Sequence, residues 1–214
     1  MNIMLFEEFT NRTLSSNITV YNDYLDDYKD SDRSGIVGWE YPGSQAQNFK
    51  LVTEQIENGD SILDYGCGIG DFINYLQNKI KIKAYLGVDI NEKFIELAKE
   101  TYKDYKFKQI DNINQINGKW DDVCAIGVFT WYISKEEFIE TIYKLYDLCN
   151  KQVLLTLLYG ETPYKYGYST ESEKNEYWNN EYRYYDTFLF NELFPDLNIT
   201  YDYEGTTMLI KIEK

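Results

Sequence analysis

A glycine-rich loop between two apolar strands constrains the fold of this chain more than any other part of its sequence. Residues 61–71 read Ser-Ile-Leu-Asp-Tyr-Gly-Cys-Gly-Ile-Gly-Asp, and residues 85–90 read Tyr-Leu-Gly-Val-Asp-Ile. The first segment predicts a strand, a loop with alternating glycines and the start of a helix, and the second predicts a strand that ends at Asp89. This order predicts a βαβ unit, which is typical of nucleotide-binding folds.

The position of Asp89 indicates that the ligand of this unit contains a ribose. Asp89 lies 23 residues after Gly66, close to the spacing of about 20 residues at which an acid binds ribose hydroxyls in such units. Glycine suits the loop because a Cβ atom there would keep a ligand away from the backbone. We therefore expect the unit to bind an adenosine.

The charge of the loop favours a cationic ligand over a dinucleotide. The dinucleotide fingerprint G-x-G-x-x-G requires glycine at position 71, where this chain has Asp71. Asp71 and Asp64 would bring negative charge close to a pyrophosphate at the helix N-terminus. S-adenosylmethionine carries a sulfonium and an ammonium group, so the acidic loop favours it over NAD and FAD.

The same loop resembles a family motif. Residues 64–70, Asp-Tyr-Gly-Cys-Gly-Ile-Gly, look like the D-x-G-x-G-x-G first motif of class I S-adenosylmethionine-dependent methyltransferases. Asp89 matches the acid that follows the second strand in this family, and Asp111 matches the position beside the adenine. Residues 122–129 resemble the family's fourth-strand motif. Residues 38–45, Gly-Trp-Glu-Tyr-Pro-Gly-Ser-Gln, are similar to a segment that closes over the cofactor in some small members.

This resemblance, which covers roughly residues 44–160, implies S-adenosylmethionine as the cofactor and S-adenosylhomocysteine as its product. The residues that it implies at the cofactor are Trp39, Gln45, Asp64, Gly66, Gly68, Asp89, Ile90, Asp111, Asn112 and Gly127. The loop glycines should lie against the methionine and ribose part of the cofactor. Asp89 should accept hydrogen bonds from both ribose hydroxyls, which are charge-assisted contacts.

Several of these roles have open alternatives. Ile90 could pack on the adenine face, while either Asp111 could accept a hydrogen bond from the adenine amino group or Asn112 could bond a ring nitrogen. The Gly127 carbonyl is expected to face the ammonium group. The Trp and Gln of residues 38–45 either complete the wall of the site or are a core tryptophan and a glutamine on a helix surface.

The acceptor side is expected after the fourth and fifth strands. Its predicted residues are Phe129, Trp131, Tyr132, Tyr159 and Tyr164. Residues 160–185 form a long polar and aromatic segment without clear period, and long segments of this kind often have a function, so we interpret them as an acceptor lid. The alternative is a tyrosine-rich surface in a chain that contains 22 tyrosines. No catalytic base is predicted.

The pattern of apolar segments predicts an α/β fold. The resemblance implies the three-layer Rossmann-like methyltransferase fold, with a mostly parallel seven-stranded sheet that ends in an antiparallel C-terminal hairpin. Expected strands cover residues 62–65, 83–88, 107–110, 123–129, 153–159, 199–203 and 206–212. Expected helices include residues 44–58, 91–102, 134–148 and 187–194. Residues 1–43 are interpreted as an N-terminal arm or cap, and residues 44–214 as the cofactor-binding domain.

The net charge limits the kinds of partner that the chain is expected to bind. With 36 acidic and 21 basic residues, the formal net charge is −15, which opposes binding to nucleic acids and anionic membranes. The first residues lack the basic start and apolar run of a signal peptide, and no window is apolar enough for a membrane span. We expect a cytoplasmic protein whose partner is a small-molecule acceptor, and the sequence does not predict its oligomeric state.

The cysteine and histidine content limits which disulfides, metal ligands and general bases the chain can have. Three cysteines without a C-x-x-C pair form no complete disulfide framework, and Cys67 fits the loop as a small buried side chain. The chain contains no histidine, which removes the commonest metal ligand and the commonest general base. No metal site is predicted.

The absence of two motifs argues against some classes of methyl acceptor. Residues 127–130, Gly-Val-Phe-Thr, replace the Asp/Asn-Pro-Pro-Tyr/Phe signature that similar enzymes use on exocyclic amines of bases or on glutamine, and no Pro-Cys nucleophile is present. The resemblance therefore implies a methyltransferase that acts on O or N of a small molecule. Alternatives are a protein or peptide methyltransferase and a noncatalytic cofactor-binding scaffold.

Overall fold

The structure is a computed structural model, and it describes residues 18–28, 33–39, 43–130, 135–159, 184–185 and 187–214. Three of the predicted acceptor residues, Trp131, Tyr132 and Tyr164, lie outside the described residues, as does nearly all of the predicted lid. No helix in the described part of the chain combines the length and the apolar character needed to cross a membrane.

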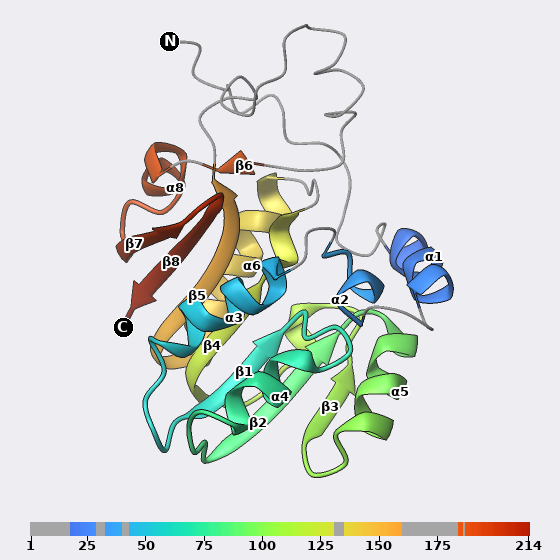
Figure 1. Ribbon diagram of the computed structural model, residues 1–214. Helices are drawn as coiled ribbons and strands as arrows, with labels where there is room; N and C mark the ends of the chain where they lie inside the picture. The colour runs from blue at the N-terminus through green and yellow to red at the C-terminus, as the bar shows by residue number, and fades with distance from the viewer. Residues whose placement is uncertain (1–17, 29–32, 40–42, 131–134, 160–183, 186) are drawn as a thin grey trace, which may run out of the picture.

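Eight strands of the described residues form one sheet in the order β3-β2-β1-β4-β5-β8-β7, and β6 pairs with β5 (Figure 1). Their bounds are β1 (Ser61–Tyr65), β2 (Ala84–Asp89), β3 (Lys106–Gln109), β4 (Trp120–Ile126), β5 (Cys149–Tyr159), β6 (Tyr184–Tyr185), β7 (Asn198–Glu204) and β8 (Thr207–Glu213). Strands β1 to β6 pair in parallel, whereas β8 runs antiparallel to β5 and β7. The predicted mostly parallel sheet with its C-terminal hairpin is confirmed, and the short β6 is an addition.

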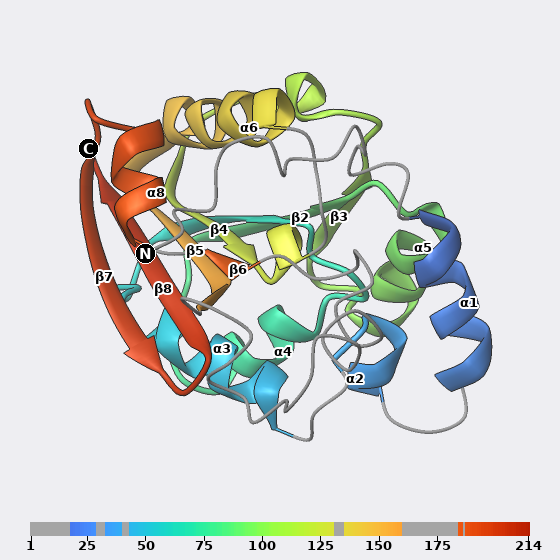
Figure 2. The ribbon, with the colours of Figure 1, turned by 90° about the horizontal axis from the view of Figure 1, so that it is seen from above.

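Helices cover both faces of the sheet, which confirms the predicted three layers. Helices α3, α4 and α5 lie on one face, and α6 and α8 lie on the other (Figure 2). Their bounds are α3 (Ser44–Thr53), α4 (Asp71–Gln77), α5 (Glu92–Thr101), α6 (Lys135–Leu148) and α8 (Thr187–Leu193). Strands that are covered on both faces are apolar almost throughout, which explains the continuous apolar runs of β4 and β5.

The sheet separates two hydrophobic clusters. Strand β1 contributes to both because its side chains alternate: Leu63 points to the α6 side and Ile62 to the α4 side. Phe138 on α6 packs edge-to-face against Phe190 on α8, with ring centroids 5.9 Å apart. On the opposite face, the Phe49 ring of α3 lies 5.2 Å from the Phe72 ring of α4. These buried aromatic pairs fix the helices against the sheet.

Two element ends differ from their predicted positions for identifiable reasons. Strand β4 ends at Ile126, because Gly127 has a φ of 70° and turns the chain into a 3₁₀ helix, η4 (Val128–Thr130). Helix α3 ends at Thr53, and the tighter hydrogen bonds to residues three positions back begin in the next turn, where the Gln55 amide donates to the Val52 carbonyl.

The N-terminal cap packs against the end of α5. It contains α1 (Ile18–Tyr28) and α2 (Arg33–Ile36), which lie side by side near the Gly-rich loop (Figure 1). The acidic run in α1 suggests a solvated surface, but the Tyr21 ring packs edge-to-face on Phe94 at 5.9 Å. The aspartates of α1 are exposed, whereas Tyr21 makes the contact with α5. The domain boundary at residue 43 stays a prediction.

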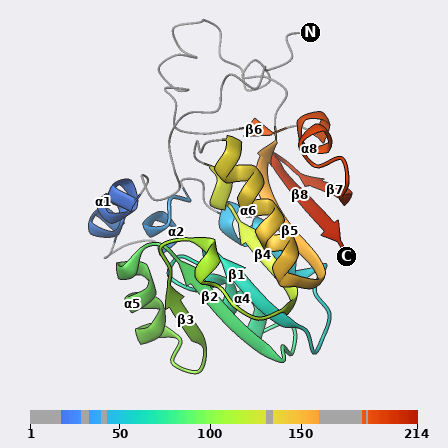
Figure 3. The same ribbon diagram turned by 180° about the vertical axis from the view of Figure 1, so that it is seen from behind.

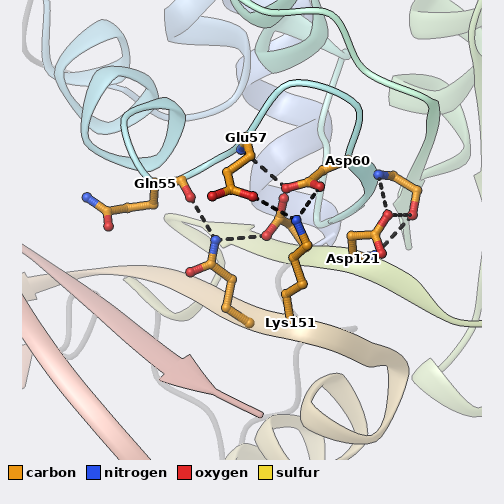
Figure 4. A network of polar contacts seen from close by, with 8 residues as sticks. Gln55, Glu57, Asp60, Asp121 and Lys151 are labelled. Carbon is orange, nitrogen blue, oxygen red and sulfur yellow. Dashed lines mark hydrogen bonds and ion pairs between the residues drawn. The ribbon is translucent and has the colours of Figure 1, made fainter.

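A polar network lies at the end of the sheet away from the N-terminal cap, where β1, β4 and β5 begin (Figure 4). Lys151 contacts Asp60 at 2.6 Å and Glu57 at 3.0 Å. The Gln152 amide donates to Asp122 Oδ1 at 2.8 Å, while no hydrogen bond to Asp122 Oδ2 is found among the described residues. Asp122 is 0% exposed, and burial beside Asp60 raises its pKa to about 7.

We predict that Asp122→Asn makes the protein more stable at neutral pH. The folded state holds a proton on Asp122 that the unfolded state releases above about pH 4, so wild-type stability falls as the pH rises from there toward 7. The neutral Asn side chain does not titrate, so the variant avoids this loss of stability, and its carbonyl oxygen can still accept the hydrogen bond from Gln152. The free energy of unfolding, measured by urea denaturation, should exceed that of the wild type by about 1–2 kcal/mol at neutral pH, and the gain should vanish near pH 4.

Asp121→Asn is the matched control, because the neighbouring Asp121 is only partly buried and its pKa is lowered by hydrogen bonds from the Ser61 amide and hydroxyl. Its ionised form stabilises the fold above its unfolded pKa, so the substitution should lower stability at neutral pH. Equal responses of the two variants would contradict the assignment of a buried proton to Asp122.

Candidate functional site

A pocket opens at the carboxyl ends of β1, β2 and β4, under the N-terminal cap. It brings together eight of the predicted cofactor residues, namely Trp39, Gln45, Asp64, Gly66, Gly68, Asp89, Ile90 and Gly127. Figure 3 shows from behind how α2 lies above the strand ends, with α6 on the near face of the sheet. Ligands of open α/β sheets bind at this edge, so the pocket is the candidate functional site.

The Gly-rich loop turns back onto the end of β2. The amides of Gly66 and Cys67 both donate to the Val88 carbonyl, at 2.8 and 3.0 Å. Gly66 and Gly68 have φ values of 73° and 53°, which disfavour other residues. A Cβ atom at Gly66 would collide with the Val128 side chain, and one at Gly68 would lie 2.8 Å from Val37. The glycines thus allow the loop to approach both η4 and the cap.

Asp89 ties this loop to the next helix. Its Oδ2 accepts a hydrogen bond from the Gly68 amide at 2.9 Å, and its Oδ1 accepts one from the Asn91 amide at 2.8 Å. Burial raises the pKa of Asp89, and these backbone hydrogen bonds oppose the rise. The carboxylate is therefore held in one orientation, and each oxygen retains a lone pair that can accept a further hydrogen bond.

Asp64 lies behind the loop in a more apolar setting. It is 2% exposed, and the Tyr85 hydroxyl donates a hydrogen bond to its Oδ2 at 2.5 Å. Burial raises the pKa of Asp64 to about 7, against the lowering effect of the Tyr85 hydrogen bond. At neutral pH, Asp64 therefore carries only part of the negative charge that a solvated aspartate would carry.

Asp71 is compensated by a cation from the cap. Arg33 donates to Asp71 Oδ1 from Nε at 3.0 Å and from Nη2 at 2.8 Å, and the Tyr102 hydroxyl donates to the same oxygen at 2.8 Å. Asp71 therefore repels a pyrophosphate less than its sequence position indicates, because Arg33 offsets its charge. Asp89 and the ionised fraction of Asp64 remain as the negative groups at the pocket.

Trp39 and Gly127 form the wall on the β4 side. The Trp39 ring lies so close to Gly127 that a Cβ atom there would be 3.0 Å from Cζ2. The Gly127 carbonyl accepts a hydrogen bond from the Thr130 hydroxyl at 2.9 Å, and its amide donates to the Thr156 hydroxyl at 3.0 Å. The backbone of this turn is thus fixed at the rim of the pocket.

Two predicted cofactor residues lie outside the pocket. Asp111 is exposed and accepts hydrogen bonds from the side-chain amides of Gln109 and Gln115. Asn112 is also exposed, and its side chain caps the 3₁₀ helix η3 (Ile113–Gln115). At this end of the pocket the structure places Ile110, which is buried. An apolar contact thus occupies the region where a polar contact to adenine is predicted.

The two described acceptor residues, Phe129 and Tyr159, do not line this pocket. Phe129 is 0% exposed and packs edge-to-face on Phe138 at 5.2 Å, so it belongs to the core. Tyr159 lies at the end of β5 with its ring 4.8 Å from that of Tyr203, outside the lining of the pocket. Within the described residues, the structure therefore does not assemble the predicted acceptor side.

Several residues that line or support the pocket were missed by the sequence analysis, and four of them are instructive. Arg33, Val37 and Tyr21 come from the cap, which precedes the segment covered by the resemblance, and no local pattern marks them. Ile110 could have been found, because it is the last apolar residue of the predicted third strand.

The sequence also matches a known domain. Residues 63–152 match the family model described as "Methyltransferase domain", and they contain β1 through the start of β5, including the Gly-rich loop and Asp89. The match covers less than half of the chain, and it includes the segment that carries the predicted cofactor motif. A solved structure of magnesium protoporphyrin IX methyltransferase from Synechocystis PCC 6803, with bound SAM, has the same fold: its TM-score is 0.63 at 16% identity, over 92% of this chain and 97% of that chain.

Two relatives extend the comparison of the methyltransferase domain. A putative methyltransferase of Invertebrate iridescent virus 6 is 30% identical over 114 residues, which are 53% of this chain and 43% of the viral protein. The ribosomal protein L11 methyltransferase of Neisseria meningitidis is 33% identical over 81 residues, 36% of this chain and 26% of that protein. The matched regions thus span less than half the length of these curated relatives.

We predict that Arg33→Gln loosens the cap without unfolding the methyltransferase domain. Because the Arg33 side chain is 42% exposed, losing its ion pair should lower the free energy of unfolding by less than about 1 kcal/mol. Amide hydrogen exchange across residues 33–39 should nevertheless become faster, since Asp71 anchors this segment to α4. Lys50→Gln is the control, because it removes an exposed ion pair with Glu204 elsewhere. Unchanged exchange in Arg33→Gln would show that the pair does not hold the cap.

Proposed function

We propose that this protein is an S-adenosylmethionine-dependent methyltransferase that transfers a methyl group to O or N of a small-molecule acceptor. The observation that carries this proposal is the placement of Asp89, which lines a pocket beside the Gly-rich loop and is oriented by the Gly68 amide at 2.9 Å. The methyltransferase domain match supports the same conclusion.

The pocket residues fit this cofactor. Asp89 offers two fixed acceptor oxygens, which suit the adjacent hydroxyls of a ribose. Ile90 and Ile110 offer apolar contacts for an adenine ring, and the backbone of Gly66 and Gly127 leaves room at the loop for the amino-acid part. Asp64 supplies an acid for a cationic end of the ligand.

The chemistry divides between cofactor and protein. S-adenosylmethionine, when bound, supplies a methyl group on a positively charged sulfur. The protein has to orient the acceptor and exclude water, because a displacement at carbon depends mainly on alignment. Too many negative charges near the sulfur would stabilise the ground state more than the transition state, in which that charge decreases. Offsetting Asp71 with Arg33 is consistent with this requirement.

The comparisons include methyltransferases of both acceptor classes. The fold likeness extends over 97% of the chain of the protoporphyrin methyltransferase and over 77% of the chain of a ribosomal protein L11 methylase. The preference for a small acceptor therefore rests on the signatures that residues 127–130 lack. A protein acceptor is the second candidate, because the ribosomal protein L11 methyltransferase of Neisseria meningitidis is 33% identical over 81 residues. The net charge of −15 opposes a nucleic-acid acceptor.

Calorimetric titration with S-adenosylmethionine tests the cofactor. Asp89→Asn should weaken binding about 10- to 100-fold, because hydrogen bonds to a charged group contribute about 1.5–3 kcal/mol. Asp104→Asn, an exposed acid on the loop before β3, is the control for net charge and should bind like the wild type. Unchanged binding by Asp89→Asn would contradict the ribose contact, and absence of binding by the wild type would refute the proposed cofactor.

Asp111→Asn tests the predicted adenine contact separately. The exposed position of Asp111 favours unchanged affinity for S-adenosylmethionine in the same titration. A loss of tenfold or more would instead support the contact that the family resemblance implies.

Methyl transfer from radiolabelled S-adenosylmethionine in a cell extract tests the acceptor. After separation by size, we expect label among small metabolites with the wild type and a strongly reduced amount with Asp89→Asn. Label confined to protein would favour the second candidate. Binding without any transfer would favour a noncatalytic scaffold.

A further inference from the structure

A buried hydroxyl and a buried carboxyl meet directly behind the Gly-rich loop. Tyr85, on β2, is 4% exposed, and its hydroxyl donates to Asp64 Oδ2 at 2.5 Å. The two side chains come from neighbouring parallel strands, in which Asp64 pairs with Gly87. Gly87 has no Cβ atom, and the Phe107 ring and the Cys67 sulfur lie within 3 Å of the place where that atom would be.

The Tyr85 ring is fixed by its neighbours. It packs edge-to-face on Tyr105 and on Phe107, with both ring centroids 5.9 Å away. A ring held on two sides has little freedom to withdraw its hydroxyl, so the hydrogen bond to Asp64 is a fixed feature of the fold.

The other carboxylate oxygen of Asp64 is available to a ligand. Asp64 lines the pocket, and within the described residues Tyr85 is its hydrogen-bond donor through Oδ2, so Oδ1 receives no hydrogen bond from them. A carboxylate with one oxygen bound from behind and the other facing a cavity is arranged to receive a donor or a cation.

We propose that Tyr85 is a positioning residue of the cofactor site, whose hydroxyl favours the ionised form of Asp64 and directs its carboxylate toward the cationic end of the ligand. This inference rests on the proposed function, and it adds a residue that no motif marks. Tyr85 acts through Asp64 and does not line the described pocket.

The groups around Asp64 explain why a hydrogen bond matters there. The titratable groups that face it are Tyr85 and Asp89 from β2, Cys67 from the loop and Cys124 from β4. Each of them would become negative on ionisation, so none stabilises an ionised Asp64 by its charge. Tyr85 donates the hydrogen bond that favours the charged form, and a bound cation would add to it.

The sign of the pH dependence follows. Burial raises the pKa of Asp64 to about 7, so affinity for a cationic ligand should rise as the pH rises through this value. Tyr85→Phe removes a hydrogen bond to the charged form and should raise the pKa further. The variant should therefore bind more weakly around neutral pH and regain its affinity at alkaline pH.

Calorimetric titration of wild type and Tyr85→Phe with S-adenosylmethionine from about pH 6 to 9 tests this inference. For a further rise of one pKa unit, Kd of the variant should be about five- to tenfold higher than that of the wild type below pH 7, and nearly equal at pH 9. The amino group of the ligand titrates equally with both proteins, so it cancels in the ratio. The ratio for 5′-methylthioadenosine, which lacks both charged groups, should stay close to one at every pH.

Tyr105→Phe is the matched control, because it removes a hydroxyl that contacts Gln77 from the adjacent ring and leaves Asp64 untouched. A pH-independent ratio for Tyr85→Phe, or an equal loss of 5′-methylthioadenosine binding, would reduce Tyr85 to a packing role and overturn the inference.

Asp64→Asn covers the case in which Tyr85→Phe does not fold. This variant should lose affinity for S-adenosylmethionine but not for 5′-methylthioadenosine, and its remaining pH profile should be that of the ligand amino group alone. A wild-type profile in Asp64→Asn would overturn the inference. If the wild type binds neither ligand, the proposed function fails together with it, whereas a flat ratio with normal wild-type binding refutes only the role of Tyr85.

Discussion

The return of the Gly-rich loop onto the end of β2 is the constraint on which the site depends. Three backbone amides, those of Gly66, Cys67 and Gly68, donate to the last residues of β2, two to the Val88 carbonyl and one to the Asp89 carboxylate. Because β1 and β2 pair in parallel, this return places the first residue after β1 against Val88, one residue before the end of β2. The carboxylate that would bind a ribose is thereby fixed by the same bonds that shape the loop.

The buried carboxyl groups at the two ends of β1 have partners of different charge. At its start, Asp60 is compensated by Lys151, whose ammonium lies 2.6 Å away. At its end, Asp64 has a neutral partner, the Tyr85 hydroxyl. A buried acid with a cation beside it is a closed structural unit, whereas one with only a neutral donor can still gain energy from a cationic ligand. The difference in partner distinguishes the structural end of the sheet from the binding end.

The sequence predicted the sheet and the loop because both depend on local patterns. Apolar runs long enough for strands covered on both faces mark β4 and β5, and glycines mark the loop. The end of β4 was placed three residues too late, because apolar residues continue past Gly127 into η4. Contacts between distant residues left no such pattern: Arg33 and Asp71 are 38 positions apart, and Tyr85 and Asp64 are 21 apart. The outward direction of Asp111 depends on the bend after β3, which side-chain type does not determine.

Charge at the site is lower than the composition indicates, and this bears on methyl transfer. The chain has a net charge of −15, yet Asp71 is paired with Arg33 and the pKa of Asp64 is raised to about 7 by burial. A strongly negative cavity would bind a sulfonium tightly and then resist the loss of that positive charge during transfer. In the proposed function, the partly ionised Asp64 attracts the cation and the oriented Asp89 carboxylate accepts from neutral hydroxyls, which separates recognition from the reacting centre. The Arg33 ion pair therefore contributes to the electrostatics of the pocket as well as to the position of the cap.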